Sequence, residues 1–190
     1  MKEYKRRGYL VIDDFLPADV ANQINLLYQD VEDWQKIEQT GSNHSNSSVD
    51  KKSAKVAKFS RSNNLEQSAQ INNIFDEYFK PKLRNLSGVD LKKYDKRCYK
   101  LQKGDYYKTH IDDYIGNIGC IYYVNKDWAW DWGGILHINS DDSVDVAESI
   151  KPKFNRIIFI DHENFKSPHS VSIISQYAKE SRYTMVSFNK

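Results

Sequence analysis

The sequence predicts a mainly β fold with flanking helices, specifically a double-stranded β-helix (jelly roll) with two N-terminal helices packed on its outside. From Asp95 onward, seven short apolar runs are separated by turn residues with no helical pattern between them, which favours an antiparallel sandwich or barrel. Before that point, two stretches carry apolar residues at helical spacing. The 190 residues fit one domain. Residues 1–94 would supply a strand, helical support and a mobile loop at 37–60, and residues 95–190 the jelly-roll core.

The N-terminal part is expected to begin with a short strand over Gly8 to Asp14 and a helix that starts near Pro17. The helix stripe steps by 4, 3, 4 and 3 residues through Val20, Ile24, Leu27, Val31 and Trp34. A second helix is expected from Asn64 to Phe79, with Asn64 and Gln67 as a capping box. Both stripes are typical of core-facing helices rather than of a binding site.

The core strands are expected where short apolar runs lie between Gly, Asn, Asp and Pro turns. They are Arg97–Gln102, Tyr106–Ile111, Ile118–Val124, Ile135–Ile138, Arg156–Ile160, His169–Ile174 and Arg182–Phe188.

The loop from 37 to 60 contains the polar run Gly41 to Ser48 and then several lysines, with no periodicity of either kind. Its basic residues could contact nucleic acid, but no nucleic-acid-binding motif accompanies them, so a solvated or substrate-covering surface loop is favoured. The net charge of +2 supports the same conclusion and gives no reason to expect an anionic membrane partner.

The two cysteines, Cys98 and Cys120, lie in apolar runs and are too few for a disulfide framework. Free, buried thiols in a cytoplasmic protein are therefore expected. No stretch approaches the 18 apolar residues of a membrane span, and the apolar run after Gly8 is too short for a signal peptide.

The candidate chemistry starts at His110-Ile111-Asp112, because a strand would present both polar side chains on one face. An exposed strand-end pair is the alternative to a metal site. His169 opens a late strand, and a second histidine from a distant strand would complete a facial triad of two histidines and one carboxylate, which suits Fe(II) and oxygen chemistry.

Arg182 opens the last expected strand. A guanidinium inside an apolar barrel needs an anion, and a carboxylate can pair with it through two hydrogen bonds. A dicarboxylate cosubstrate would fit, with Tyr123 or Tyr99 adding a hydrogen bond. The alternative is an exposed arginine paired with Glu180.

The remaining polar and aromatic candidates are weaker. His137 and His162 lack an acidic residue two positions on, and His44 lies in the polar loop, so all three are interpreted as structural or solvent-facing. Trp128, Trp130 and Trp132 could form an aromatic binding rim, although packing beneath a loop is the commoner role.

The second half of the chain resembles the Fe(II)/2-oxoglutarate-dependent dioxygenases of the prolyl 4-hydroxylase superfamily, in particular the hypoxia-inducible-factor prolyl hydroxylases and their bacterial relatives. The resemblance spans about residues 8 to 188, with specific motifs confined to 97–188. The matching runs are Tyr107-Lys-Thr-His-Ile-Asp112, Cys120-Ile-Tyr-Tyr-Val-Asn-Lys-Asp-Trp128, Gly133-Gly-Ile-Leu-His-Ile138, Ile150-Lys-Pro-Lys-Phe-Asn-Arg-Ile-Ile-Phe159, Pro168-His-Ser-Val171 and Arg182-Tyr183.

The resemblance implies that His110, Asp112 and His169 bind Fe(II) and that Arg182, helped by Tyr123, holds the distal carboxylate of 2-oxoglutarate. It places Tyr99 near the cosubstrate and Leu136, Val171 and Ile121 in the apolar wall of the same pocket. O2 is the second cosubstrate, and ascorbate is a candidate reductant. The implied products are succinate, CO2 and a hydroxylated substrate.

The chain also departs from this family. The connection from His110 to Ile121 is shorter than in those enzymes, and the segment from His169 to Arg182 is longer by a few residues. Gly116-Asn-Ile-Gly119 stands where those enzymes carry an arginine before the strand, and Arg61-Ser62-Asn63 replaces their Arg-Gly-Asp, which implies that the acidic partner of Arg61 is lost.

Three functions remain open from the sequence. The first is hydroxylation of prolyl residues in a protein or peptide, with the 37–60 loop covering the bound chain. The second is hydroxylation of a small molecule or free amino acid. The third is a non-catalytic jelly-roll binding module that uses the Trp128, Trp130 and Trp132 cluster.

Overall fold

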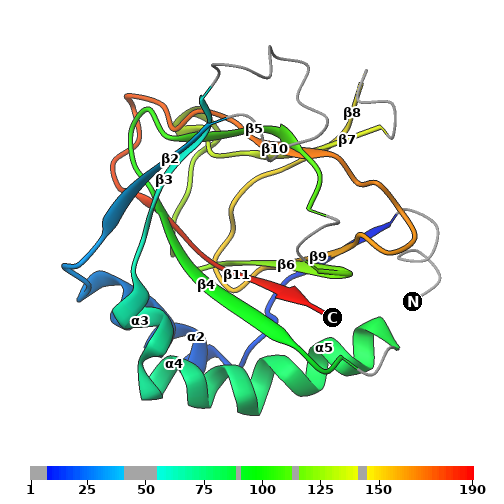
Figure 1. The fold of residues 1–190 in the computed structure, drawn as a ribbon. Coiled ribbons are helices and arrows are strands. Elements are labelled where there is room, and N and C mark those ends of the chain that lie inside the picture. Colours follow the sequence, from blue (N-terminus) through cyan, green and yellow to red (C-terminus); the bar gives the residue numbers. More distant parts are fainter. Residues whose placement is uncertain (1–7, 41–54, 89–90, 113–115, 141–144) are drawn as a thin grey trace.

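The computed structural model describes residues 8–40, 55–88, 91–112, 116–140 and 145–190, and over these residues the chain forms one strongly curled antiparallel sheet (Figure 1). The strand order is β1-β9-β6-β11-β4-β3-β5-β10-β7-β8, with β2 paired to β3. The strands are β1 (Tyr9–Ile12), β2 (Gln35–Thr40), β3 (Lys55–Arg61), β4 (Tyr94–Leu101), β5 (Tyr106–His110), β6 (Ile118–Tyr123), β7 (Leu136–Asn139), β8 (Val146–Ile150), β9 (Ile157–Asp161), β10 (His169–Val171) and β11 (Arg182–Asn189).

The curl brings two parts of the sheet face to face. β1, β9, β6, β11 and β4 form what we call the first layer, and β5, β10, β7 and β8 form the second layer above it in Figure 1. β3 joins the layers because it pairs with β4 at one end and with β5 at the other. The mainly β class and the jelly-roll curl predicted from the sequence are therefore confirmed.

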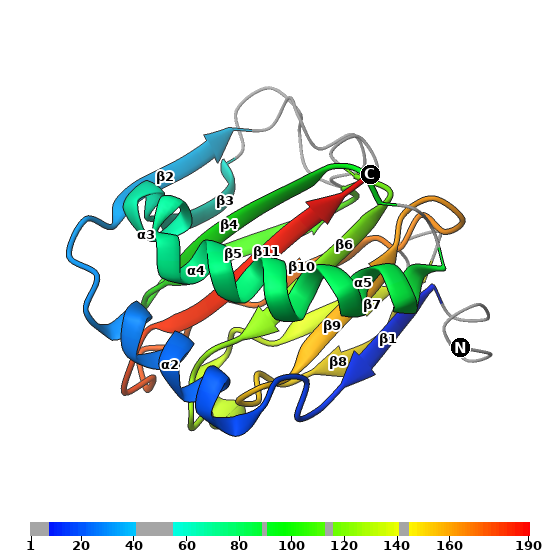
Figure 2. The ribbon, with the colours of Figure 1, turned by 90° about the horizontal axis from the view of Figure 1, so that it is seen from below.

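Helices cover the outer face of the first layer, as Figures 1 and 2 show from two sides. They are α2 (Ala18–Gln29), α3 (Asn63–Gln67), α4 (Ala69–Ile74), the π-helical turn η1 (Phe75–Phe79) and α5 (Lys80–Ser87). A 3-10 turn, η2 (Trp130–Trp132), lies between β6 and β7. No helix of the described residues is long and apolar enough to cross a membrane.

The predicted single helix from Asn64 to Phe79 is wrong in two respects. The capping box on Asn64 and Gln67 does not form. Instead, Ser62 Oγ accepts a hydrogen bond from the backbone N–H of Leu65, and Ser68 Oγ accepts one from Ile71. The segment is divided into α3 and α4 because Ser62 and Ser68 each cap the start of a separate helix. The helical path then continues through η1 and α5 to Ser87.

The first predicted helix ends early, at Gln29. Val31 and Trp34 continue the apolar spacing but lie beyond the helix, where both are partly buried against the core. The spacing of Val31 and Trp34 therefore reflects packing against the same apolar core as the helix, not continuation of the helix.

The loop predicted for 37–60 is also wrong where the structure describes it. Residues 35–40 and 55–61 form the hairpin partners β2 and β3, with Ile37 opposite Phe59. Residues 41–54, including the polar run and Lys51 and Lys52, lie outside the described residues. The seven core strands appear close to their expected bounds, and β8 is an additional edge strand.

Two apolar clusters occupy the two faces of the first layer. Tyr122 and Met185 pack toward the helices with Phe15 and Phe79, whereas Tyr123 and Ile121 pack between the layers. All of β6 is buried, which explains why it reads as a continuous apolar run rather than an alternating one. Cys98 and Cys120 are buried free thiols in the helix-side cluster, as expected.

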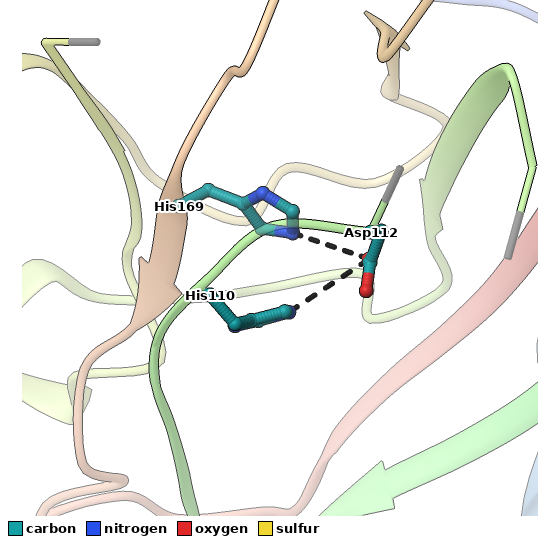
Figure 3. A group of neighbouring side chains, drawn as sticks. All are labelled: His110, Asp112 and His169. Carbon is teal, nitrogen blue, oxygen red and sulfur yellow. Dashed lines mark ion pairs between the residues drawn. The ribbon is translucent and has the colours of Figure 1, made fainter. Parts of the chain in front are cut away.

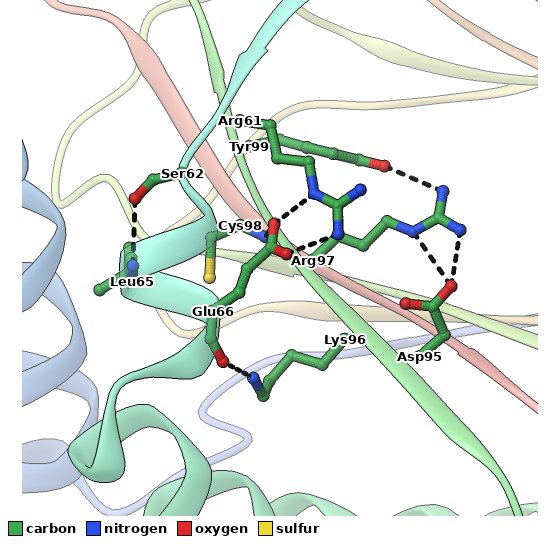
Figure 4. A network of polar contacts seen from close by, with 9 residues as sticks. All are labelled: Arg61, Ser62, Leu65, Glu66, Asp95, Lys96, Arg97, Cys98 and Tyr99. Atoms are coloured by element: carbon green, nitrogen blue, oxygen red, sulfur yellow. Dashed lines mark hydrogen bonds and ion pairs between the residues drawn. The ribbon is translucent and has the colours of Figure 1, made fainter. Parts of the chain in front are cut away.

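A buried carboxylate links α3 to β3 and β4 (Figure 4). Glu66 accepts two hydrogen bonds from Arg61, at 2.7 and 2.6 Å, and a third from the backbone N–H of Cys98 at 2.8 Å. The expectation that Arg61 has lost its acidic partner is therefore wrong. Glu66, five residues along the chain, supplies the carboxylate, while Ser62 donates to Asp33 instead.

We expect Glu66→Gln to destabilise the fold by about 1–3 kcal/mol, since it removes the charge that satisfies Arg61 in a buried position. Urea unfolding measures the effect as a lower midpoint at an unchanged slope. Glu38→Gln is the matched control, because the Glu38–Lys55 pair is exposed and should contribute far less. Equal midpoint shifts for the two variants would show that the Glu66 network contributes no special stability.

Candidate active site

Three metal-ligating side chains meet on the inner face of the second layer (Figure 3). His110 ends β5, Asp112 follows two residues later, and His169 begins β10 directly opposite His110 in the strand register. One ligand atom of each lies within 4.8 Å of the others. Asp112 Oδ2 is 3.7 Å from Nε2 of His110 and 3.5 Å from Nε2 of His169.

Backbone carbonyls fix the orientation of both imidazoles. Nδ1 of His110 lies 2.7 Å from the carbonyl oxygen of Lys108, and Nδ1 of His169 lies 3.0 Å from that of Ser167. A carbonyl only accepts, so each Nδ1 carries a hydrogen, and Nε2, the atom that faces Asp112, is the nitrogen left for a metal to bind. In metal-bound histidines, a hydrogen bond from the ring nitrogen that does not bind the metal fixes the tautomer in the same way.

Electrostatics keep the carboxylate of Asp112 ionised. Burial would raise the pKa of Asp112, but the charge of His110 and the hydrogen bond from His169 outweigh burial and hold this pKa below its usual range. Burial lowers the pKa of His169, and the contact with Asp112 raises it above its usual value. Two imidazole nitrogens and one carboxylate oxygen form the donor set that leaves open positions on a metal such as Fe(II).

A pocket lies in front of these three residues, between the two layers. Its floor follows the strand period, because alternate residues of β4 (Arg97, Tyr99 and Leu101) and of β11 (Arg182, Thr184, Val186 and Phe188) face it. Ile121 of β6 and Val171 of β10 add apolar walls.

Arg182 is a buried cation in this pocket, only 2% exposed, so the alternative of an exposed arginine paired with Glu180 is wrong. Its Nε and Nη2 atoms are buried without a hydrogen-bond partner among the described residues, and its guanidinium lies 4.9 Å from the ring centre of Tyr123. Buried donors without partners are costly. A carboxylate placed against this guanidinium would satisfy them.

The tyrosines of the pocket remain protonated donors. Burial raises the pKa of Tyr99 to about 12, and burial also raises the pKa values of Tyr107 and Tyr123. The hydroxyl groups of Tyr107 and Tyr123 are buried without hydrogen-bond partners in the described part of the chain. Tyr99 lines the pocket, whereas Tyr123 and Leu136 lie in the apolar cluster that surrounds it.

Sequence reasoning missed several polar residues of the pocket. Arg97 and Tyr107 line it, and so does His162, whose ring centre is 5.8 Å from that of His169. His162 is buried, which rules out its predicted solvent-facing alternative. The alternation of Arg97 with Tyr99 on one strand was the signal that could have identified Arg97.

The Gly133-Gly134 pair allows the chain to pass close to Arg182. Both glycines have positive φ, 69° and 64°. A Cβ on Gly134 would lie 2.8 Å from Cδ of Arg182 and 2.7 Å from Cδ1 of Ile174, and one on Gly133 would lie 2.0 Å from the carbonyl oxygen of Ile173. The glycine pair is thus required where the backbone presses on the buried arginine.

We expect Gly134→Ala to displace Arg182 and to raise the KM for a carboxylate ligand of the pocket about tenfold or more. Gly88→Ala is the matched control. Gly88 has nearly the same φ, 65°, but nothing lies within 4 Å of its added Cβ, so it should cost only the local backbone strain of about 1 kcal/mol. Unchanged ligand binding in Gly134→Ala would contradict the proposed crowding.

The tryptophan cluster does not form one recognition surface. Trp128 is buried and donates from Nε1 to the carbonyl oxygen of Gly133 at 2.8 Å, Trp132 packs edge-on against it, and Trp130 is exposed. Trp128 therefore supports the glycine turn beside Arg182, as the packing interpretation predicted.

Comparison with known proteins connects this site to one superfamily. A family model described as the 2OG-Fe(II) oxygenase superfamily matches residues 94–189. Egl nine homolog 1 of Rattus norvegicus is 30% identical over 190 residues, covering 95% of this chain and 54% of that protein. Prolyl hydroxylase EGLN3 of Mus musculus is 37% identical over 87 residues, covering 43% and 35%. The chain thus spans about half the length of the Egl nine homolog 1 proteins it matches.

Solved structures share the fold. A Pseudomonas putida prolyl-4-hydroxylase superimposes with a TM-score of 0.72 at 14% identity, covering 100% of this chain and 95% of that one. A Trichoplax adhaerens prolyl hydroxylase in complex with a hypoxia inducible factor oxygen degradation domain peptide fragment gives 0.65 at 18% identity, covering 99% and 86%.

Proposed function

Since this chain belongs to the 2OG-Fe(II) oxygenase superfamily, we propose that it is an Fe(II)- and 2-oxoglutarate-dependent dioxygenase that hydroxylates prolyl residues of a protein or peptide. The observation that carries this proposal is the shared pocket of the His110, Asp112 and His169 donor set and the buried Arg182. A metal-binding group and a fixed cation in one pocket are what a chelating dicarboxylate requires.

The residues take distinct roles in this proposal. Nε2 of His110, Nε2 of His169 and a carboxylate oxygen of Asp112 would hold Fe(II), because these atoms converge and both rings are already oriented by carbonyls. When bound, the iron centre supplies the coupled chemistry, in which 2-oxoglutarate and O2 yield succinate, CO2 and a hydroxylated C–H position. Ascorbate is the candidate reductant for the metal.

Arg182 would pair with the distal carboxylate of 2-oxoglutarate through its open Nε and Nη2 groups, with Tyr123 donating a hydrogen bond. Ile121 and Val171 would exclude water from the reacting groups, while Leu136 supports the same wall from behind. Tyr99 lies where it can donate to the cosubstrate or to the substrate. All of these groups are on strands, which hold them rigidly.

Prolyl residues are the proposed target because one matched relative, Prolyl hydroxylase EGLN3 at 37% identity over 87 residues, carries that activity in its name. A reducing, cytoplasmic setting fits the two buried free thiols.

The test is a substrate screen with the full chain, Fe(II), 2-oxoglutarate, ascorbate and O2. Proline-containing peptides are compared with matched alanine peptides and with free L-proline, and product mass and succinate are both measured. We expect one added oxygen on a prolyl residue for each succinate released. Oxidation of free proline alone would instead identify a small-molecule hydroxylase, and succinate that never couples to proline would reject prolyl hydroxylation.

A further inference from the structure

The pocket contains a second arginine, at the opposite end of the same sheet face from Arg182. Arg182 of β11 pairs with Leu101 of β4, and Arg97 lies four residues away from Leu101 along β4. At about 3.3 Å per residue, the two ends are about 13 Å apart. Tyr99 lies between them on the same face of β4, and all of these residues line the pocket.

Arg97 is held in place but keeps part of its guanidinium open (Figure 4). Nε and Nη2 donate to Asp95 Oδ2 at 3.2 and 2.6 Å, Nη1 donates to the hydroxyl of Tyr99 at 3.4 Å, and the group lies 4.8 Å from the ring centre of Phe188. A guanidinium has five N–H donors, and these contacts use three. Among the described residues, the end formed by Nη1 and Nη2 therefore retains one hydrogen on each nitrogen that makes no contact.

The charges of the pocket leave Arg97 without a role in cosubstrate binding. Three charged side chains line the pocket in the described part of the chain, namely Arg97, Arg182 and Asp112. Asp112 belongs to the metal donor set, and Arg182 is matched to the distal carboxylate. Asp95 does not line the pocket, so the positive end of Arg97 is the group that a second anion would meet there.

The surroundings of Arg97 also suit a substrate rather than a cofactor. Its side chain is 22% exposed, in contrast to the buried Arg182, so Arg97 lies nearer to solvent. Val186 and Phe188 lie beside it on the pocket face of β11 and offer an apolar surface. A ligand with a carboxylate next to an apolar group would fit both features.

We propose that Arg97 binds a carboxylate of the primary substrate through its Nη1 and Nη2 edge, and so selects substrates that carry an acidic group near the oxidised carbon. This inference rests on the proposed function, because it assigns the residue that would choose among substrates of that site. The carboxylate could come from an acidic side chain near the prolyl residue of a peptide or from the α-carboxylate of a free amino acid. The test below distinguishes the two.

Substrate probes differ only in the acidic group. Proline-centred peptides carry either Asp or Asn at each of three positions on both sides, and free L-proline is compared with L-prolinamide. Wild type, Arg97→Gln, Arg97→Lys and Asp95→Asn are assayed for kcat and KM of each probe. Binding of the same probes to the Mn(II)-loaded, 2-oxoglutarate-bound enzyme provides a readout that does not depend on turnover.

Matched variants separate recognition from structure. Arg156→Gln is the control, since Arg156 makes a similar two-point pair with Asp13 outside the pocket. Asp95→Asn tests the competing view that Arg97 exists only to pair with Asp95. On that view, Asp95→Asn and Arg97→Gln should behave alike. The KM for 2-oxoglutarate reports any indirect displacement of Tyr99.

We expect wild type to prefer the acidic member of one probe pair by about tenfold or more in kcat/KM, mainly through KM, as a charge-assisted pair should provide. Arg97→Gln should reduce this preference to about twofold or less, Arg97→Lys should retain part of it, and Asp95→Asn and Arg156→Gln should keep it. A preference at one peptide position identifies an acidic peptide, and a preference confined to free proline identifies an amino acid.

Two results overturn the inference. One is an acidic preference that survives in Arg97→Gln, and the other is equal turnover and binding of the acidic and amide probes by wild type. Failure of the proposed function gives a different signature, namely absence of metal-dependent 2-oxoglutarate binding and of succinate in wild type itself.

Discussion

Asp112→Ala is expected to lower Fe(II) affinity more than about 100-fold and to reduce succinate formation to background. Asp112 is the single carboxylate among the three ligands, and its oxygen faces both Nε2 atoms at 3.5 and 3.7 Å. Without it, two neutral imidazoles remain, and they cannot balance the metal charge. Anaerobic titration with Fe(II), or with Mn(II) as a redox-stable substitute, measures the loss directly.

The control for this variant is Asp131→Ala, because Asp131 is an exposed aspartate in the 3-10 turn η2 and should leave metal binding unchanged. His169→Ala should reproduce the effect of Asp112→Ala, whereas His137→Ala, on the neighbouring strand β7, should not. Wild-type metal affinity in Asp112→Ala would place the metal elsewhere in the protein.

Arg182→Met is expected to raise the KM for 2-oxoglutarate about 100-fold or more while leaving the unliganded protein as stable as wild type, or more so. The two parts have one cause. Arg182 is buried, and its Nε and Nη2 have no hydrogen-bond partner among the described residues, so in the unliganded fold these donors lack the pairing that a bound anion would supply. Methionine removes that cost and the carboxylate contact together.

Thermal unfolding with and without 2-oxoglutarate and Mn(II) measures both parts. Wild type should gain stability from the ligand, and Arg182→Met should begin equal or higher and gain little. Arg156→Met is the matched control, because its arginine pairs with Asp13 outside the pocket. Strong destabilisation of unliganded Arg182→Met would mean that the arginine is already satisfied within the fold.

The core strands could be predicted because buried strands consist largely of apolar residues. β6 is buried throughout and reads as a continuous apolar run. β2 and β8 could not be predicted in the same way, since β2 is largely polar and both strands are largely exposed. Within the described part of the chain both pair along one edge, so backbone hydrogen bonds to β3 and β7 hold them more than apolar contacts do.

The metal donor set could be predicted only in part from spacing. His110 and Asp112 are two residues apart, which gave a local signal, but the meeting of His169 with His110 depends on strand register between β5 and β10. The resemblance to the prolyl hydroxylases was what predicted that His169 and His110 would lie in one site. Nothing local indicated that Ser167 and Lys108 carbonyls would set both tautomers.

The sequence did not indicate that one residue would replace the lost partner of another. The loss of the acidic residue after Arg61 suggested an unpaired arginine, yet a serine cap starts a helix that returns Glu66 to it. The place of Arg97 in the pocket depends on the second layer folding over its strand, which is a long-range feature of the fold.

Anaerobic calorimetric titration of 2-oxoglutarate into the full chain, with and without Fe(II), measures whether the pocket binds iron and cosubstrate together. We expect one binding event per chain that requires the metal and disappears in both Asp112→Ala and Arg182→Met. Tight binding of 2-oxoglutarate without metal, or binding that survives in both variants, would contradict the assignment of this pocket to iron and cosubstrate.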